Sequence, residues 1–194
     1  LGQTWSEPVL ALIKYNGVNR VVMIVGGGYD PLYDSARPTS ANPMGNAIYL
    51  VVAYGANAGE VLWWSSASGA SEPGNHVTNA ALADSIPSSV KVLDRDGDGF
   101  VDHFYVGDLG GQIHRFDIKQ VSASSTTITH DLVAQLGRRG DSEDAEDDRR
   151  FFFPPSVALM ADGAQQFVGI AMGSGLMTSP NDAVVDERFY FIKD

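Results

Sequence analysis

The sequence predicts an all-β fold, and two observations support this prediction. Short apolar runs rich in Val, Ile, Phe and Tyr alternate with turn residues, and the chain holds 21 glycines and 9 prolines, which is typical of strands joined by tight turns. A unit of three strands recurs along the chain. The length and composition bear on domain number: 194 residues, of which 44% are hydrophobic, can bury one substantial core, so residues 1–194 are expected to belong to a single domain.

The recurring unit begins with a proline-led strand, expected at 6–13, 86–93 and 154–160. A second strand runs into glycines, and a third, aromatic strand follows it. The second strands are expected at 20–30, 103–111 and 166–175, and the third at 47–54, 112–118 and 188–194. Such repetition predicts a radial β architecture, in which each unit forms one blade and neighbouring blades bury each other's faces. Three units would form part of a propeller, and a β-sandwich with evenly spaced strands is the alternative.

Long insertions separate the predicted strands, at 31–46, 65–85 and 119–150, and are expected to form loops on a rim. A short helical turn is predicted at 79–84. The stretch 138–150 contains six acidic residues between arginine pairs, and like charges at this density favour a solvated, poorly ordered loop. Trp63 and Trp64 are expected to pack between blades, because adjacent strand residues face opposite sides.

The net charge of −11 argues against binding a nucleic-acid backbone through a general electrostatic field, and it permits cations and basic surfaces as partners. The chain has no cysteine, which excludes disulfides and thiolate metal sites. Its longest apolar stretches, such as 47–54, are far below membrane-spanning length, so no membrane insertion is expected. The first residues carry no signal-peptide pattern, and the chain is expected to be a fragment whose targeting signals lie elsewhere.

One stretch, DRDGDGFVD at 94–102, predicts a calcium site. Asp94, Asp96, Asp98 and Asp102 fall where a calcium loop places ligands one, three, five and nine. The carbonyl of Phe100 falls at position seven, and a glycine stands at the sharp turn of position six. Oxygen ligands without histidine or sulfur favour Ca²⁺ over zinc or copper, and a flexible glycine-rich loop suits Ca²⁺ better than Mg²⁺.

This loop is not expected to be an EF-hand. Position twelve, where an EF-hand supplies a bidentate Glu, is Tyr105, which lies inside a predicted strand. The motif also occurs once, which weakens the alternative of a dockerin, where two such loops are paired. Water is expected to complete the ligand shell. We expect the metal to order the loop and fix the hairpin at 103–118; a metal-free acidic turn in solvent is the alternative.

Other candidate motifs are weaker. Arg139, Gly140 and Asp141 spell RGD, which could contact an integrin, although coincidence in an acidic loop explains the tripeptide as well. The four histidines, at 76, 103, 114 and 130, show no metal or catalytic spacing, so no catalysis is assigned to them. His103 and His114 could be cross-strand neighbours in one hairpin. The glycines at 26–28 and 107–111 lack a phosphate-loop pattern and are interpreted as hairpin turns.

The motifs together resemble the C-terminal domain of the PilC/PilY family, the pilus-associated adhesins that assist type IV pilus biogenesis. The resemblance covers TWSEPV, VGGGYD, GNAIYLV, FFFPPSVAL, GIAMGSG, DERFYFIKD and above all the block SIPSSVKVLDRDGDGFVDHFYVGDLGGQIHRFDI. It implies a modified, quinoprotein-like β-propeller, of which residues 1–194 would be a fragment of several blades with long inter-strand insertions. It also implies that Asp94, Asp96, Asp98, Asp102 and the Phe100 carbonyl bind Ca²⁺. The segment 173–189 departs from the family pattern.

The resemblance further implies a function and a location. Family members are exported to the pilus tip, outer membrane and cell surface, where they support pilus extension by opposing retraction, twitching motility and host attachment. Type IV pilus components such as minor pilins, and host cell surface receptors, would be the partners. This predicts a non-enzymatic, calcium-dependent module. One alternative is a pyrroloquinoline quinone dehydrogenase. The stretch AYGANAGEVLW at 53–63 resembles in part the tryptophan-docking repeat of such enzymes. The other alternative is a propeller scaffold without a pilus role.

Overall fold

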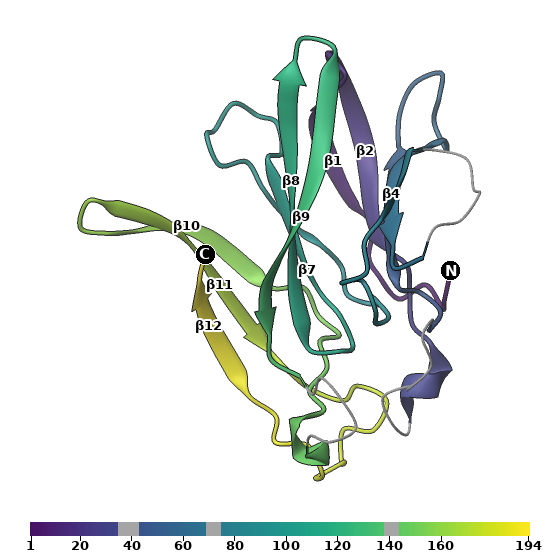
Figure 1. Ribbon diagram of the computed structural model, residues 1–194, viewed down its shortest axis with the longest axis vertical. Coiled ribbons are helices and arrows are strands. Elements are labelled where there is room, and N and C mark those ends of the chain that lie inside the picture. Colours follow the sequence, from purple (N-terminus) through teal and green to yellow (C-terminus); the bar gives the residue numbers. More distant parts are fainter. Residues whose placement is uncertain (35–42, 69–74, 138–143) are drawn as a thin grey trace.

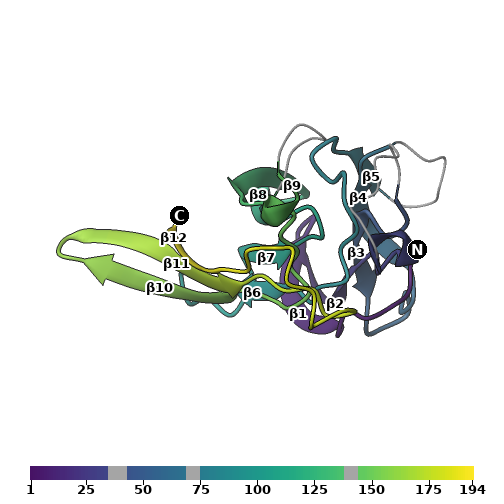
Figure 2. The ribbon, with the colours of Figure 1, turned by 90° about the horizontal axis from the view of Figure 1, so that it is seen from below.

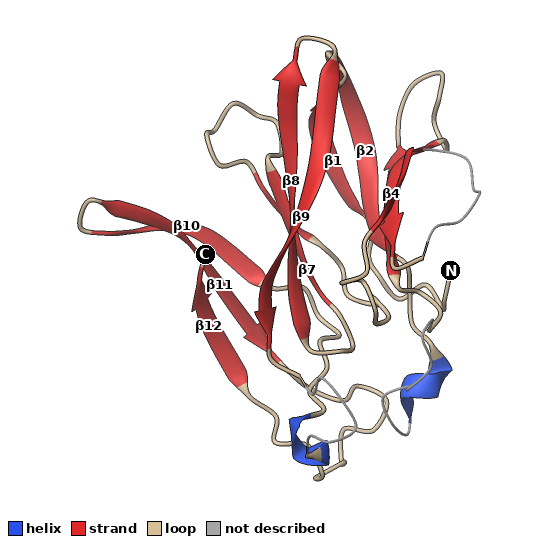
Figure 3. Cartoon of the chain, in the orientation of Figure 1, coloured by secondary structure: helices blue, strands red, loops and turns tan. Residues whose placement is uncertain are grey.

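The computed structural model describes residues 1–34, 43–68, 75–137 and 144–194, and it confirms an all-β fold. The strands form three sheets, and the described segments also include two short 3₁₀ turns at Pro31–Asp34 and Ala145–Asp147 (Figures 1 and 3). None of the three sheets closes on itself in the described part of the chain. The described residues include no helix that is long and apolar enough to cross a membrane.

The first sheet is built from the first five strands in chain order, β1 (Val9–Tyr15), β2 (Val18–Gly26), β3 (Ala47–Val52), β4 (Val61–Ser66) and β5 (Asn75–Thr78). Its pairings are antiparallel except that of β4 with β5, which is parallel. Alternate residues along β1 are buried, because successive side chains of a strand point to opposite faces. One face of this sheet therefore contributes to a core.

The second sheet contains β6 (Lys91–Leu93), β7 (His103–Gly107), β8 (Gln112–Ser122) and β9 (Ser125–Gln135), and the third contains β10 (Ser156–Asp162), β11 (Gln165–Gly173) and β12 (Phe189–Lys193). All pairings within them are antiparallel. Each predicted unit thus forms a sheet of its own from consecutive segments. A β-sandwich has two sheets, so the three sheets of this chain do not fit the sandwich alternative.

The second sheet lies between the other two (Figures 1 and 2). Phe104 and Phe116 stack at 4.7 Å between ring centroids and pack toward the first sheet, where Trp63 meets Phe116 edge-on. Tyr105 faces the other way and packs with Ile170 of the third sheet. Because neighbouring residues of one strand serve two cores, the middle sheet holds the three together.

The two tryptophans illustrate this alternation. Trp63 is buried between the first and second sheets, as predicted. Trp64 lies on the opposite face of β4, where it stacks on Tyr49 at 5.5 Å and contacts His76. Of the two tryptophans, only Trp63 therefore packs between two sheets.

Several loop predictions are wrong. Residues 119–150 contain the end of β8 and all of β9, because an alternating run of Thr, Ile and Val pairs with β8 from Ser122↔Ser125 to Gln112↔Gln135. Residues 65–85 contain β5, and the predicted helical turn at 79–84 is a single turn closed by the Leu82 N–H on the Asn79 carbonyl. The glycines at 107–111 form a hairpin turn, as predicted. Those at 26–28 lie at the end of β2 and just after it, and they form no hairpin turn.

The arginine-rich end of the acidic stretch is also better ordered than predicted. Arg149 and Arg150 are buried. Arg149 donates from Nε to the Asp186 carbonyl at 2.8 Å, and Arg150 pairs with Asp148 at 3.0 Å. Charged side chains that find partners in the folded chain can be buried, and the composition of the stretch alone does not show those partners.

Candidate metal centre

The acidic loop at 94–102 connects β6 to β7 and is closed at its base by backbone hydrogen bonds. The Asp102 N–H donates to the Leu93 carbonyl at 3.0 Å, and the Asp102 carbonyl accepts from the Ile118 N–H at 2.8 Å. The Val101 N–H donates to Leu12 of β1 at 2.9 Å. The loop is thus tied to β8 and to the neighbouring sheet, so its conformation is coupled to the packing of two sheets.

Within the loop, the carboxylate of Asp94 organises the turn. Its two oxygens accept from the N–H groups of Gly97 at 2.7 Å and Gly99 at 2.9 Å. Both glycines have positive φ, of 79° and 90°, which residues with a Cβ rarely adopt. Asp96 accepts from the Asp98 N–H at 3.1 Å. The alternation of Asp and Gly in the sequence therefore encodes this turn directly.

Three of the predicted ligands converge. Asp94, Asp96 and Asp102 each offer a carboxylate oxygen, and these oxygens all lie within 4.8 Å of one another. Asp98 does not belong to this group, and its Oδ1 accepts from the Phe100 N–H at 2.8 Å. Binding by Asp98 and by the Phe100 carbonyl stays a prediction.

This donor set fits a calcium ion. Ca²⁺ takes six to eight oxygen ligands in flexible geometry, and the loop supplies three carboxylates close together, of which Asp96 is exposed and the others partly buried. Like charges about 4 Å apart repel by roughly 1 kcal/mol in water and about 4 kcal/mol near a protein surface. A divalent cation would reverse that repulsion.

The loop borders two hollows that also contain cationic side chains. The first, of 340 Å³, is lined by Asp96, Asp98, Lys14 and Lys119 among others. The second, of 480 Å³, is lined by Asp102, Arg95 and His103 together with Lys119. The charge field at the acidic loop is therefore mixed.

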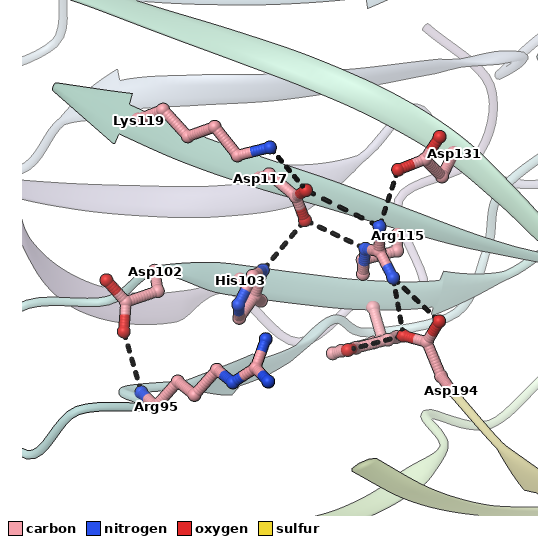
Figure 4. A network of polar contacts seen from close by, with 9 residues as sticks. Arg95, Asp102, His103, Arg115, Asp117, Lys119, Asp131 and Asp194 are labelled. Atoms are coloured by element: carbon pink, nitrogen blue, oxygen red, sulfur yellow. Dashed lines mark hydrogen bonds and ion pairs between the residues drawn. The ribbon is translucent and has the colours of Figure 1, made fainter. Parts of the chain in front are cut away.

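A polar network extends from the base of the loop to the third sheet (Figure 4). Asp117 accepts from His103 at 2.7 Å and from Arg115 Nε at 2.8 Å, and Lys119 lies 3.2 Å away. Burial raises the pKa of Asp117, but the hydrogen bonds and the cationic neighbours outweigh burial and hold it below its ordinary value.

Arg115 carries this network across to the C-terminal strand. Its guanidinium binds Asp194 through two contacts of 2.6 and 2.8 Å, and Asp194 also accepts from the Tyr105 hydroxyl at 2.9 Å. Burial, followed by the hydrogen bond to Asp194, raises the pKa of Tyr105. Both contacts come from Nη1 of Arg115, and this charge-assisted pair joins the second and third sheets near the acidic loop.

A second group of titratable side chains was missed at the sequence level. Asp108 and His114 are fully buried, and His114 Nε2 lies 3.0 Å from Asp108 Oδ2. The other ring nitrogen, Nδ1, lies 2.9 Å from Nε2 of His130. Asp108 Oδ1 accepts from the N–H groups of Gly110 and Gln112 at 2.9 and 2.8 Å. The three side chains form a continuous chain of hydrogen bonds, here named the Asp108–His114–His130 chain.

The strand register explains why spacing did not reveal this chain. His114 lies opposite Val106, and a β-bulge between Ile113 and His114 shifts its partner on β9. The expectation that His103 and His114 are cross-strand neighbours is wrong, because His103 lies opposite Asp117. Burial lowers the pKa of His130 from 6.5 to about 4, with a further contribution from His114.

The RGD tripeptide, Arg139, Gly140 and Asp141, lies outside the described residues.

Comparison with solved structures identifies a similar fold. The chain is similar to the crystal structure of the C-terminal domain of PilY1 from Pseudomonas aeruginosa, with a TM-score of 0.59 and 20% sequence identity. The match covers 97% of this chain, which spans 37% of that one. The likeness expected from the sequence is thus confirmed at the level of the fold. No family model and no curated protein matches the sequence.

Proposed function

We propose that this chain is a non-enzymatic, calcium-dependent module of a type IV pilus-associated protein. The observation that carries the proposal is the convergence of Asp94, Asp96 and Asp102 in a loop with calcium-ligand spacing. The fold shared with the PilY1 C-terminal domain supports the pilus assignment. Asp98 and the Phe100 carbonyl would complete the protein ligands.

In this proposal, Ca²⁺ supplies positive charge that neutralises the loop's carboxylates. Asp94 holds the turn through Gly97 and Gly99. Asp102 anchors the turn to Leu93 and Ile118. Because the same loop donates to Leu12 of the first sheet, closing it would stabilise the contact between two sheets. Calcium concentration and the rigidity of this surface would then be linked.

We further propose that the three sheets are successive blades of a quinoprotein-like propeller. Each sheet uses consecutive strands and packs face to face with the next, as blades do. The outer faces also carry apolar side chains, among them Leu10 on the first sheet and Phe191 on the third, which are 67% and 55% exposed. An apolar outer face is what a blade presents to its neighbour.

The biological role proposed is support of pilus extension by opposing retraction, with effects on twitching motility and host attachment. The protein would be exported and would act at the pilus tip, outer membrane or cell surface. Its partners would be pilus components such as minor pilins, and host cell surface receptors, with RGD at 139–141 as a candidate contact. No catalytic role is proposed for Asp108 and His114, which are fully buried.

Calcium titration of the protein tests the site. At a calcium concentration one hundred times the dissociation constant, binding to the folded state alone stabilises it by about 2.7 kcal/mol. A domain of this size should then melt about 5 to 10 °C higher. We expect Asp96→Asn to abolish most of this shift and of the calorimetric binding signal. The control Asp162→Asn, a side chain that is 77% exposed and distant in sequence, should retain both.

Complementation tests the biological role separately. The full-length protein carrying Asp96→Asn, or the control Asp162→Asn, would be expressed in a strain that lacks it. We expect fewer surface pili and smaller twitching zones with Asp96→Asn only. If Asp96→Asn abolishes calcium binding and leaves pili unchanged, the site stands and the proposed role fails. If wild-type protein binds no calcium, the site itself is wrong.

A further inference from the structure

A hollow of 360 Å³ lies where the loop 174–188, between β11 and β12, meets the segment that leads into β10. It is remote in sequence from the acidic loop and shares no lining residue with the hollows around that loop. We call it the Phe153 pocket. Its walls are mainly apolar and its rim is acidic, with Phe153, Leu176, Met177 and Pro180 in the walls and Asp182 and Glu187 at the rim.

The loop that forms this pocket is fixed by backbone hydrogen bonds to other parts of the chain. The Gly175 N–H donates to the Arg150 carbonyl at 3.0 Å, and the Asp186 N–H donates to the Glu146 carbonyl at 2.9 Å. The base of the loop is closed by the Ser174 N–H on the Arg188 carbonyl at 2.9 Å. The pocket is therefore largely pre-formed, which reduces the entropic cost of binding.

The apolar wall is partly exposed. Phe153 is 63% exposed and Met177 is 55% exposed, whereas Leu176 is buried in a cluster with Tyr29 and Phe152 and forms a firm floor. Large apolar side chains that are exposed around a concave surface are typical of a site that binds another molecule. Neither Phe153 nor Met177 belongs to a buried core cluster in the described part of the chain.

The rim determines the charge of the partner. Asp182 uses Oδ1 to accept from the Val184 N–H at 2.9 Å, and Glu187 uses Oε2 to accept from the Ser174 hydroxyl. Within the described ranges, neither carboxylate forms an ion pair with a Lys or Arg. Of the residues that the structure describes, no basic one lines the pocket. The remaining oxygens are thus available to a cation.

We propose that the Phe153 pocket binds a short peptide segment of a partner protein that places an aromatic or long aliphatic side chain beside a Lys or Arg. The apolar side chain would enter between Phe153 and Met177, and the cation would meet Asp182 or Glu187. A volume of 360 Å³ lies at the lower end of the range for binding pockets, about 300 to 1,000 Å³, so it suits one anchoring side chain and its neighbour. The proposal does not depend on calcium or on the pilus assignment.

Fluorescence anisotropy with labelled peptides tests this proposal on the whole chain. The probe is Gly-Ser-Lys-Phe-Lys-Ser-Gly, and the matched peptides replace both Lys by Glu or the Phe by Ser. We expect the probe to bind about tenfold more tightly than either matched peptide, because each lacks one of the two recognised features. Its affinity should fall as salt is raised, since salt screens exposed charge pairs.

Substitutions at exposed positions identify the pocket without unfolding the chain. Phe153→Ser should weaken binding of the probe about five- to tenfold, because it removes an apolar contact. Phe191→Ser is the control: its side chain is 55% exposed on β12 and lies outside the pocket, so binding should not change. Glu187→Gln should weaken binding of the probe. It should not change binding of an uncharged analogue of the probe in which both Lys are replaced by Ser.

Three results would overturn the proposal. The first is equal binding of the probe and the Glu-flanked peptide. The second is an equal loss of affinity in Phe153→Ser and Phe191→Ser. The third is self-association of the wild-type chain in sedimentation equilibrium that Phe153→Ser abolishes, since a second copy of this chain would then occupy the pocket.

Discussion

Two acidic regions of the second sheet contrast in how their negative charge is neutralised. In the loop 94–102, the carboxylates of Asp94, Asp96 and Asp102 converge near the surface. In the next turn of the chain, Asp108 is fully buried and receives two backbone N–H groups and a ring nitrogen of His114. Both regions use an Asp to organise a turn between strands. In the described part of the chain, only the buried region pairs its Asp with the side chain of another residue.

The difference shows where each region gets its stability. A buried carboxylate without partners would be very costly, so the Asp108–His114–His130 chain has to be satisfied within the fold. The loop carboxylates lie nearer the solvent, with Asp96 exposed and Asp94 and Asp102 partly buried, so their mutual repulsion is moderate. They can therefore remain without a counter-charge until a cation binds. The buried chain should control folding, and the acidic loop should control the response to metal.

The largest effect is expected at the buried chain. Asp108→Ala leaves the N–H groups of Gly110 and Gln112 and the ring of His114 without their acceptor. Each buried polar group that is left without its partner costs about 1 to 3 kcal/mol, so the three losses together should cost about 3 kcal/mol or more. Urea unfolding should show a decrease of that size in the free energy of unfolding.

The control for this experiment is Asp131→Ala. Asp131 also forms an ion pair, with Arg115, but its side chain is 58% exposed. Its loss should therefore cost only about 0.2 to 1 kcal/mol. Equal destabilisation by the two substitutions would mean that burial of Asp108 does not decide the stability of this sheet.

The second prediction concerns pH. The pKa of His130 is about 4 in the folded chain, against 6.5 for the ordinary group. Between these pH values the unfolded state binds a proton that the folded state does not. Titration of His130 therefore costs no free energy of unfolding above pH 6.5 and lowers it increasingly as the pH approaches 4. His130 is only partly buried, and solvent screening limits this contribution to about 1 to 2 kcal/mol.

A comparison with His130→Gln isolates this titration from that of the carboxylates. Gln retains a side-chain N–H for His114 and does not titrate. The free energy of unfolding should therefore fall less steeply from pH 7 to pH 4.5 in the variant than in the wild type. Parallel slopes would show that the pKa of His130 is the same in the folded and unfolded states.

The contrast also explains what the sequence could predict about the site. The turn at 94–102 is local: Asp94 contacts Gly97 and Gly99 within five positions, so spacing alone predicts it. The Asp108–His114–His130 chain depends on the pairing of β8 with β9 and on a β-bulge beside His114. No pattern within one strand encodes that register, and the sequence predicts a loop rather than a strand over 119–150.

The fold shows the same division. Glycine-terminated and aromatic runs predicted three separate sheets, because alternation and turn residues are local signals. β5 is short, pairs in parallel with β4 and has mostly exposed residues, so its sequence gives little sign of burial. The burial of Arg149 depends on the distant Leu136 and Asp186 carbonyls. Such partners become visible only when the chain is folded.

The smallest effect is expected from Asp96→Asn when calcium is chelated by EDTA. The substitution removes one of three converging charges but keeps an oxygen that can accept from the Asp98 N–H. Because Asp96 is exposed, the relief of repulsion should be screened, and the free energy of unfolding should change by less than about 0.5 kcal/mol, in the stabilising direction. Added calcium should reverse the sign, since the wild type alone gains from binding. Destabilisation of more than about 1 kcal/mol in EDTA, measured by urea unfolding, would show that the carboxylate of Asp96 supports the fold itself.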